Sequence, residues 1–469
     1  MRAAAKTLLL VAASALAASF IAENAVAQRN FSRTPEAMRG VNDGPRAPMH
    51  PGWHGPGVVV IGPARGIRGD TVIDDPAPAA PRQQRSANRR PSNAPPAGER
   101  RLIPDEVVIE TASGFSQRQI EALQRRHRLA RIESQPFALT GTTLYRWRIP
   151  DRRSVAAVVR TLERDPAVRS AQPNYVFELQ EDAGALTADY STQYALAKLH
   201  LPQAHALSKG DGIRVAVIDS GVDRDNAELA GSVVDSFDAL STSFAPHKHG
   251  TAIAGLIAAH GKLLGAAPGA KLLAVRAFDP RKEGATGTTF SVLKGLEWAA
   301  ANGARVVNMS FAGPDDPALH RSLAAAHKKG IVLIAAAGNA GEKSPPLYPA
   351  ADANVIAVTA TDANDSLFPQ ASRGRHIALA APGAEILVAI PGGYEISSGT
   401  SYAAAEVAGI AALMLQHDPA ITPDRLRRLL EASAKDLGAK GRDAQFGFGL
   451  ADAYAALRAD EPPVAANGR

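Results

Sequence analysis

The sequence predicts an α/β protein, with a doubly wound, mostly parallel sheet that carries helices on both faces, preceded by a small α+β domain and a disordered arm. From Gln193 onward, apolar strand-like runs alternate with helical patterns, which is typical of such a sheet. Several of these runs are apolar throughout, as parallel strands buried on both faces are. Residues 101–180 alternate as strand–helix–strand–helix–strand, and residues 28–100 have little periodic apolar pattern.

The chain has 469 residues, a net charge of +6 and no cysteine. The lack of cysteine excludes disulfides, thiolate metal sites and a cysteine nucleophile. The positive charge lies mainly in residues 28–180, whereas residues 181–469 carry 26 basic and 30 acidic residues. The C-terminal part therefore offers no basic groove of the kind that nucleic acids bind, and we expect no nucleic-acid partner.

Residues 1–27 have the features of a secretory signal peptide. Arg2 and Lys6 precede an apolar run over 7–22, and small residues around Ala27 fit a cleavage site. A membrane anchor is the alternative, but the run is short and rich in alanine. We predict cleavage, export to a periplasm or out of the cell, and no membrane span in the mature chain.

Residues 28–100 hold 12 of the 33 prolines together with many arginines and glycines. Such a composition cannot bury enough apolar surface to offset its ordering entropy, so we predict a disordered arm. A plain spacer is the simplest role, and surface tethering is the alternative.

The next 80 residues have a regular pattern. The segments 105–110, 144–149 and 170–179 read as strands, while 116–127 and 154–165 read as amphipathic helices, the first of which begins at a capping serine. This predicts a small domain at 101–180, followed by a linker at 181–192, a large domain at 193–459 and a polar tail at 460–469.

The large domain has five clear strand patterns, at 213–219, 271–278, 305–310, 331–338 and 354–360. Asp219 ends the first of them and Asn339 directly follows the fourth. Doubly wound sheets place their sites at the carboxyl ends of the strands. These two polar residues are therefore expected at the functional edge.

Four separate segments carry residues suited to acyl transfer, namely VAVIDSGVD with Asp219, HGTAIAGLIAA with His249, LIAAAGNAG with Asn339 and SGTSYAAAEVAG with Ser401. A serine hydroxyl becomes nucleophilic when a neighbouring imidazole accepts its proton, and a carboxylate can orient that imidazole. An asparagine amide can donate to an oxyanion. Taken singly, each residue has a plain structural reading as a helix cap, a turn residue or a buried polar group.

Together, in the order Asp, His, Ser and with their flanking glycines and alanines, these segments resemble the subtilisin-like serine proteases, or subtilases. The resemblance covers residues 193–459 and implies a subtilisin-like fold and a serine endopeptidase that forms an acyl-enzyme with polypeptide substrates. It implies that Asp219, His249 and Ser401 are catalytic and that Asn339 lies in the oxyanion hole. By layout and position, residues 101–180 resemble a subtilase propeptide, which implies an intramolecular inhibitor and chaperone released by self-processing within the linker.

The resemblance also implies where a substrate lies. Main-chain pairing is expected along one short segment, made of Ser310, Phe311, Ala312 and Gly313. A second segment is expected to wall the primary specificity pocket, made of Ala336, Ala337 and Gly338. Leu347 is expected at the base of this pocket, where its bulk would favour modest apolar side chains over large aromatic ones.

Four residues depart from the family pattern. Ala252 replaces a second histidine, and Tyr402, Ala405 and Glu406 replace methionine, proline and histidine after the serine. None of these changes removes a group that transfers a proton or binds the oxyanion. They nevertheless motivate a rival, a non-catalytic pseudoprotease that keeps its prodomain in the groove. An esterase or a peptide ligase is a second rival.

Two further expectations concern the segment around the candidate histidine. His247 and His260 match nothing in the family pattern and are interpreted as surface residues. The stretch HGKLLGAAP (260–268) lacks carboxylates and amides, so we expect the calcium loop that many relatives have there to be missing. No cofactor and no metal ligand are predicted, although calcium elsewhere stays open.

Overall fold

The structure, a computed structural model, describes residues 92–180, 193–242, 245–280 and 285–459, all within one compact unit, Ser86–Arg469. The expected signal peptide (1–27), residues 28–91 of the arm, the linker (181–192) and the tail (460–469) lie outside the described residues. The small domain begins earlier than the sequence predicted. Asn93 donates from its backbone N–H to Glu163 and from its side chain to Ser170. Residues 92–100, which the composition assigned to the arm, are thus tied to the small domain.

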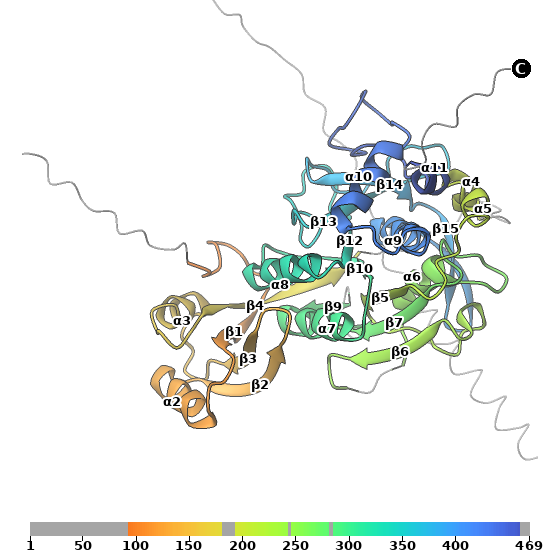
Figure 1. Ribbon diagram of the computed structural model, residues 1–469. Helices are drawn as coiled ribbons and strands as arrows, with labels where there is room; N and C mark the ends of the chain where they lie inside the picture. Colours follow the sequence, from red (N-terminus) through yellow and green to blue (C-terminus); the bar gives the residue numbers. More distant parts are fainter. Residues whose placement is uncertain (1–91, 181–192, 243–244, 281–284, 460–469) are drawn as a thin grey trace, which may run out of the picture. The chain divides into compact units, whose positions relative to one another are not determined.

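The small domain has the order β-α-β-β-α-β (Figure 1), with β1 (Leu102–Ala112), α2 (Gln117–His127), β2 (Ala130–Phe137), β3 (Thr142–Arg148), α3 (Val155–Leu162) and β4 (Ser170–Leu179). Its four strands lie in the order β2-β3-β1-β4, and each pair is antiparallel. Ser116 caps α2, as the sequence predicted, and Ser154 caps α3. A separate apolar cluster that includes Trp147 and Leu162 joins the helices to the sheet.

Strand β2 is an element that the sequence pattern did not indicate. It lies at the edge of the sheet and most of its residues are exposed or half-buried. It also contains Pro136, which sheets tolerate at an edge. Without a buried face, its sequence has no alternation to detect.

The large domain contains a seven-stranded sheet in the order β14-β13-β12-β10-β5-β7-β6, and every pair in it is parallel. Its strands are β5 (Arg214–Asp219), β6 (Val233–Asp238), β7 (Lys271–Arg276), β10 (Val306–Met309), β12 (Val332–Ala336), β13 (Val355–Thr361) and β14 (Ile377–Pro382). The five predicted strands are all present. The two additional strands, β6 and β14, form the edges.

Helices cover both faces of this sheet (Figure 1). Val215 and Val217 of β5 belong to the apolar cluster that holds α6 (Lys248–Ala258) and α9 (Thr400–His417). The alternate residues Ala216 and Ile218 belong to the cluster that holds α7 (Thr289–Ala301) and α8 (Pro317–Lys328). This alternation is the signature of a doubly wound fold, and it confirms the predicted fold class.

The remaining elements lie around this core. They are α4 (Tyr194–Lys198), α5 (Leu201–Ala204), the short 3-10 helix η1 (Ala227–Leu229), the hairpin β15 (Ile386–Ile390) and β16 (Gly393–Ser397), α10 (Pro423–Ser433) and α11 (Ala453–Arg458). No helix in the described ranges combines the length and the apolar character that crossing a bilayer requires.

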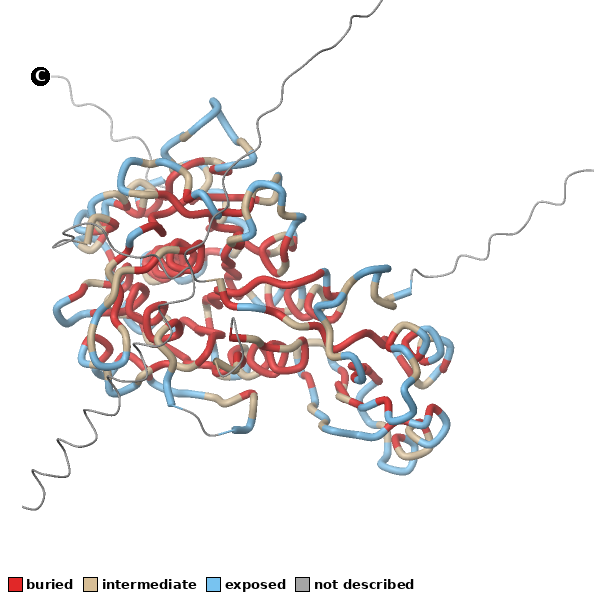
Figure 2. Tube along the Cα trace, turned by 180° about the vertical axis from the view of Figure 1, so that it is seen from behind, coloured by how far each residue is buried: buried red, intermediate tan, exposed pale blue. Residues whose placement is uncertain are grey.

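The last strand of the small domain continues into the large one. Strand β4 pairs antiparallel with β9 (Thr286–Thr288) on one side and with β11 (Phe311–Ala312) on the other, and β8 (Phe278–Asp279) extends the sheet beyond β9. Most of β4 is buried (Figure 2). The end of the small domain is therefore built into the surface of the large one.

Candidate active site

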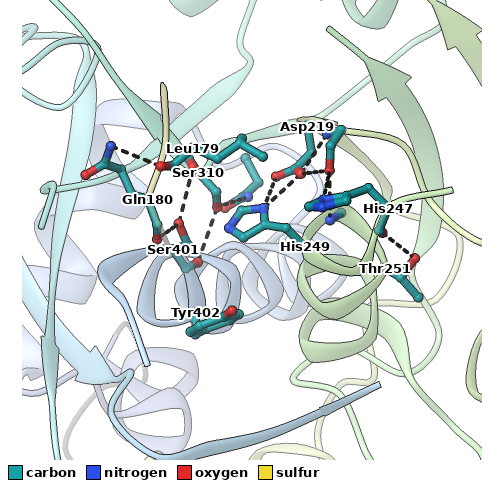
Figure 3. Close-up of polar contacts among 12 residues, drawn as sticks. Leu179, Gln180, Asp219, His247, His249, Thr251, Ser310, Ser401 and Tyr402 are labelled. Atoms are coloured by element: carbon teal, nitrogen blue, oxygen red, sulfur yellow. Dashed lines mark hydrogen bonds and ion pairs between the residues drawn. The ribbon is translucent and has the colours of Figure 1, made fainter. Parts of the chain in front are cut away.

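Asp219 and His249 lie together at the carboxyl end of the sheet (Figure 3). Asp219 ends β5, and His249 lies in the first turn of α6. The two carboxylate oxygens of Asp219 lie 2.8 and 2.9 Å from His249 Nδ1, and neither side chain is accessible to solvent. Asp219 also accepts a 2.7 Å hydrogen bond from the backbone N–H of Ser220. This arrangement fixes the plane of the imidazole and favours its positively charged form.

Ser401 lies in the first turn of α9, after Gly399, and is fully buried. Figure 3 shows the imidazole of His249 between Asp219 and Ser401. The Oγ atom of Ser401 lies 2.5 Å from the carbonyl oxygen of Gln180 and 3.2 Å from that of Ser310. The N-terminus of the 18-residue helix α9 favours negative charge beside this hydroxyl.

Asn339 follows β12 and faces the start of α9. Its Oδ1 accepts hydrogen bonds from the backbone N–H of Thr400 at 3.1 Å and from the Thr400 hydroxyl at 2.9 Å. A backbone N–H can only donate, so these bonds fix which end of the amide carries the NH₂ group. That group, Nδ2, is buried and has no hydrogen-bond partner among the described residues. A buried donor of this kind is suited to an oxyanion that forms only during a reaction.

The groove beside Ser401 is occupied by the end of the small domain. Phe311 pairs with Leu179 and Ala312 with Glu178, while the backbone N–H of Gln180 donates to Ser310 O at 3.2 Å. On the other side, Leu179 donates to the carbonyl of Ala285 at 3.3 Å. Of the segment that the sequence assigned to substrate binding, Ser310 to Ala312 thus hold an extended peptide by their main chain, whereas Gly313 pairs with Tyr348.

The predicted specificity pocket forms around Gly338. A Cβ atom on this glycine would lie 2.6 Å from Leu347 Cδ1, 3.1 Å from Ser372 Oγ and 3.7 Å from the side-chain oxygen of Gln180. Leu347 is buried, and Gln180 accepts a 2.8 Å hydrogen bond from the backbone N–H of Asn339. Ala336 and Ala337, which precede the glycine, are fully buried at the end of β12. Gly338 therefore lies close to both Leu347 and the side-chain oxygen of Gln180.

The four departures from the family pattern are all buried. Tyr402 places its ring centroid 6.0 Å from that of His249 and donates its hydroxyl to Ser397 at 2.8 Å. Glu406 points into the packed interior, where burial raises its pKa to about 8. Ala252 and Ala405 are small residues within the core of α6 and α9. None of these four side chains interrupts the Asp219–His249 pair.

The sequence interpretation of His247 as a surface residue was wrong. Its side chain is half-buried, and its Nδ1 lies 3.0 Å from the hydroxyl of Ser220, a fully buried residue next to Asp219. His260, in contrast, is exposed. Thr400, Gln180 and Ser220 were also not predicted to contribute to the site. Thr400 and Ser220 had a signal in the sequence, because they lie within the GTS and IDSGVD motifs, whereas Gln180 had none.

The stretch from His260 to Pro268 is tied to Gln193, at the start of the large domain. Both ends of the Gln193 side-chain amide are bonded to the main chain of Leu264, at 2.8 and 2.9 Å. In the described ranges, no group of three or more acidic or histidine side chains is placed to hold a metal ion.

Comparison with known proteins agrees with this geometry. The subtilase family (peptidase S8) matches residues 210–449, and the fervidolysin N-terminal prodomain matches residues 88–174. Over 277 residues the chain is 35% identical to thermitase from Thermoactinomyces vulgaris, covering 57% of this chain and 96% of thermitase. It is 34% identical over 322 residues to the minor extracellular protease Epr of Bacillus subtilis, covering 66% of this chain and 49% of Epr.

A solved structure shares the fold. The crystal structure of fervidolysin from Fervidobacterium pennivorans, described as a keratinolytic enzyme related to subtilisin, superposes with a TM-score of 0.66. At 24% identity, the match covers 77% of this chain and 62% of fervidolysin. With its parallel sheet, its Asp–His pair beside a helix-terminal serine and a matching prodomain, this chain belongs to the subtilase family of peptide hydrolases.

Proposed function

We propose that this chain is an exported serine endopeptidase made as a self-processing zymogen. The observation that carries the proposal is the 2.5 Å contact between Ser401 Oγ and the carbonyl oxygen of Gln180, the last described residue of the small domain. A peptide carbonyl thus lies beside the candidate nucleophile, and the backbone N–H of Asn339 holds the side chain of the same residue, Gln180. A pseudoprotease would not need the oriented side-chain amide of Asn339.

In the proposed reaction, His249 carries protons in both the acylation and the hydrolysis of the acyl-enzyme. His249 accepts the proton of Ser401 as Oγ bonds to the carbonyl carbon, and the carbonyl π electrons move onto the oxygen. Asn339 Nδ2 and the backbone N–H of Ser401 would donate to this oxyanion. His249 then gives its proton to the leaving amine, and the peptide bond breaks. Water, deprotonated by His249, hydrolyses the acyl-enzyme and restores Ser401.

The same contact supports a proposal for the first bond to be cut. The carbonyl next to Ser401 is that of Gln180, so the proposed processing site is the bond between Gln180 and Glu181. This lies at the start of the linker in which processing was expected. After cleavage, strand β4 would stay paired with β9 and β11 as an inhibitor until it dissociates.

The proposed substrates are polypeptide segments that can adopt an extended conformation. Pairing with Ser310 to Ala312 uses main-chain groups, which gives affinity without strong side-chain selection. Gly338 lies close to both Leu347 and the side-chain oxygen of Gln180, so we expect the pocket to accept medium-sized residues better than large aromatic ones.

Self-processing is tested with the variant Ser401→Ala. In a protease-deficient host this variant should accumulate as the uncleaved precursor, whereas the wild type should yield a product that begins Glu181-Asp182-Ala183 on mass spectrometry. The exposed Ser366→Ala provides a control for handling, since it keeps Ser401 and its surroundings. Normal processing of Ser401→Ala would contradict the proposal.

Labelling separates the enzyme from the pseudoprotease alternative. A fluorophosphonate should react with the processed wild type at Ser401 and leave Ser401→Ala unlabelled. A wild-type chain that stays unlabelled after removal of the prodomain would favour a peptide-binding protein. Matched ester, amide and amine-acceptor substrates would then distinguish a protease from an esterase or a ligase.

Export rests on the sequence of residues 1–27 and on the extracellular location stated for Epr. The test is the fractionation of a native host culture, with mass spectrometry of the chain. Material that keeps residues 1–27 and remains in the cytoplasm would refute export but would leave the catalytic proposal untouched.

A further inference from the structure

We propose that His247 is a positioning residue that acts on Asp219 through the hydroxyl of Ser220. This inference deepens the proposed function, since it assumes that Asp219 and His249 form the catalytic pair. Ser220 Oγ lies 3.0 Å from Asp219 Oδ1 and 3.0 Å from His247 Nδ1 (Figure 3). Two imidazoles therefore act on one buried carboxylate, His249 directly and His247 through a single hydroxyl.

The local packing holds this arrangement together. Helix α6 begins directly after His247, and its first turn lies against the end of β5. A Cβ atom at Gly250 would be 2.3 Å from the carbonyl oxygen of Gly221 and 3.2 Å from Asp219 Oδ1. Only a glycine permits this approach. It brings His247 and His249, on either side of Lys248, close to the end of β5 that carries Asp219. The backbone N–H of Gly250 also lies 3.4 Å from Ser220 Oγ.

The single hydroxyl proton of Ser220 explains how His247 can affect Asp219. A serine hydroxyl has one proton to donate and two lone pairs that accept. If His247 Nδ1 carries a proton and donates it to Ser220 Oγ, the serine proton is directed to Asp219 Oδ1. If Nδ1 is unprotonated, it competes with the carboxylate for the same proton. The buried negative charge of Asp219 favours the first arrangement, in which both hydrogen bonds run toward the carboxylate and strengthen each other.

The proposed contact affects the orientation of the catalytic base, His249, and not the binding of substrate. A carboxylate held from one side by Ser220 presents its two oxygens to His249 Nδ1 in one orientation. Loss of the His247 donor frees the Ser220 hydroxyl to rotate, so His249 is less well placed to accept the proton of Ser401. Because His247 acts through Ser220, its effect should disappear when Ser220 has no hydroxyl.

The test measures the rate at which a fluorophosphonate labels Ser401 in the processed enzyme. This small probe needs the catalytic base but not the peptide groove. His247→Leu should lower the second-order labelling rate about fivefold, the equivalent of one hydrogen bond of about 1 kcal/mol. His247→Asn should retain most of the rate because its amide reaches the position of Nδ1, whereas the longer His247→Gln should resemble His247→Leu.

A double-mutant cycle gives the second readout. Ser220→Ala should lower the rate, and adding His247→Leu to it should cause no further loss. Lys248→Gln is the matched control, because Lys248 is adjacent and pairs with Glu395 on β16, away from Asp219. The thermal midpoints of all variants are measured, so that a comparison of Asn with Gln at position 247 remains informative if His247→Leu folds poorly.

Three outcomes would overturn the inference. They are an unchanged labelling rate in His247→Leu, additive losses in the double variant, and a rise of KM for peptide substrates with unchanged labelling, which would make His247 a substrate contact. A wild type that is not labelled would instead refute the proposed function. The two failures are therefore distinguishable.

Discussion

At the scale of single residues, the orientation of the Asn339 amide is the most specific feature of the site. The Oδ1 atom is held by two donors from Thr400, and the hydroxyl of Thr400 in turn accepts from the backbone N–H of Gly338 at 3.1 Å. The helix N-terminus and the end of β12 thus set the amide jointly. An oxyanion donor of this kind is oriented before the reaction begins, so no reorganisation is needed when the charge develops.

Replacing Asn339 should therefore slow catalysis without weakening substrate binding. For Asn339→Ala we expect turnover to fall by about 10²–10³-fold, a magnitude taken from the equivalent donor in subtilisin. KM should change little, because the hydrogen bond forms only in the transition state. Steady-state kinetics on a peptide substrate provide the measurement. The exposed Asn364→Ala is the control, and a loss that appears mainly in KM would argue against an oxyanion role.

At the scale of elements, helix α9 carries Ser401 in its first turn and is almost fully buried. Almost all of its residues are buried, and most are small, which lets it pack closely on the sheet. One of these buried residues is Glu406, whose pKa is raised to about 8 by burial. The helix thus carries a carboxyl group that is neutral in the folded protein at neutral pH.

The buried carboxyl makes stability depend on pH in a defined direction. Between its ordinary value of 4.5 and about 8, the unfolded chain loses the Glu406 proton while the folded chain keeps it. The free energy of unfolding should therefore fall as pH rises through this window, by about 1.4 kcal/mol for each pH unit crossed. Below pH 4.5 and above pH 8 this contribution is constant.

Glu406→Gln should remove this contribution, because an amide does not titrate. The thermal midpoint of the variant relative to the wild type should rise from pH 5 to about pH 8 and then level off, in an inactive Ser401→Ala background. The exposed Glu342→Gln serves as the control. A difference between variant and wild type that does not change with pH would refute the assignment to Glu406.

At the scale of the whole molecule, the described part of the chain forms a continuous structure across two domains. Strand β4 pairs with β1 of the small domain and with β9 and β11 of the large domain. Buried polar contacts also join the two domains. Gln172 donates a 2.6 Å hydrogen bond to Asp316 and accepts one of 2.8 Å from the backbone N–H of Ala318, with all of these groups buried. Asp316 caps α8, and burial raises its pKa.

Removal of the Gln172 amide should loosen the prodomain after processing. Gln172→Leu removes two buried hydrogen bonds across the interface, at a cost of about 0.5–1.5 kcal/mol for each, while Asp316 still accepts from the backbone N–H groups of Ala318 and Leu319. We expect the cleaved prodomain to dissociate at least about tenfold faster. The rate at which activity appears after cleavage provides the measurement. The exposed Gln117→Leu is the control. Equal release rates in the two variants would contradict this role of the interface.

Much of this fold was accessible from the sequence because its core is periodic. The five central strands are continuous apolar runs, and the capping serine Ser116 marks the start of α2. The edge strands β2 and β6 were missed because most of their residues are exposed or half-buried, which leaves no alternation to detect. Strand β14 was missed because it is short and rich in alanine, a residue with little strand preference.

The sequence alone determined the family resemblance, the fold class and the identity of Asp219, His249, Asn339 and Ser401 as candidates, because short motifs and local periodicity are carried by adjacent residues. Tertiary structure decided which carbonyl lies beside Ser401, which way the Asn339 amide points and how His247 reaches Asp219. These relations join residues tens to hundreds of positions apart. They depend on hydrogen-bond geometry and burial, which arise only when the packed core fixes the distances between the elements.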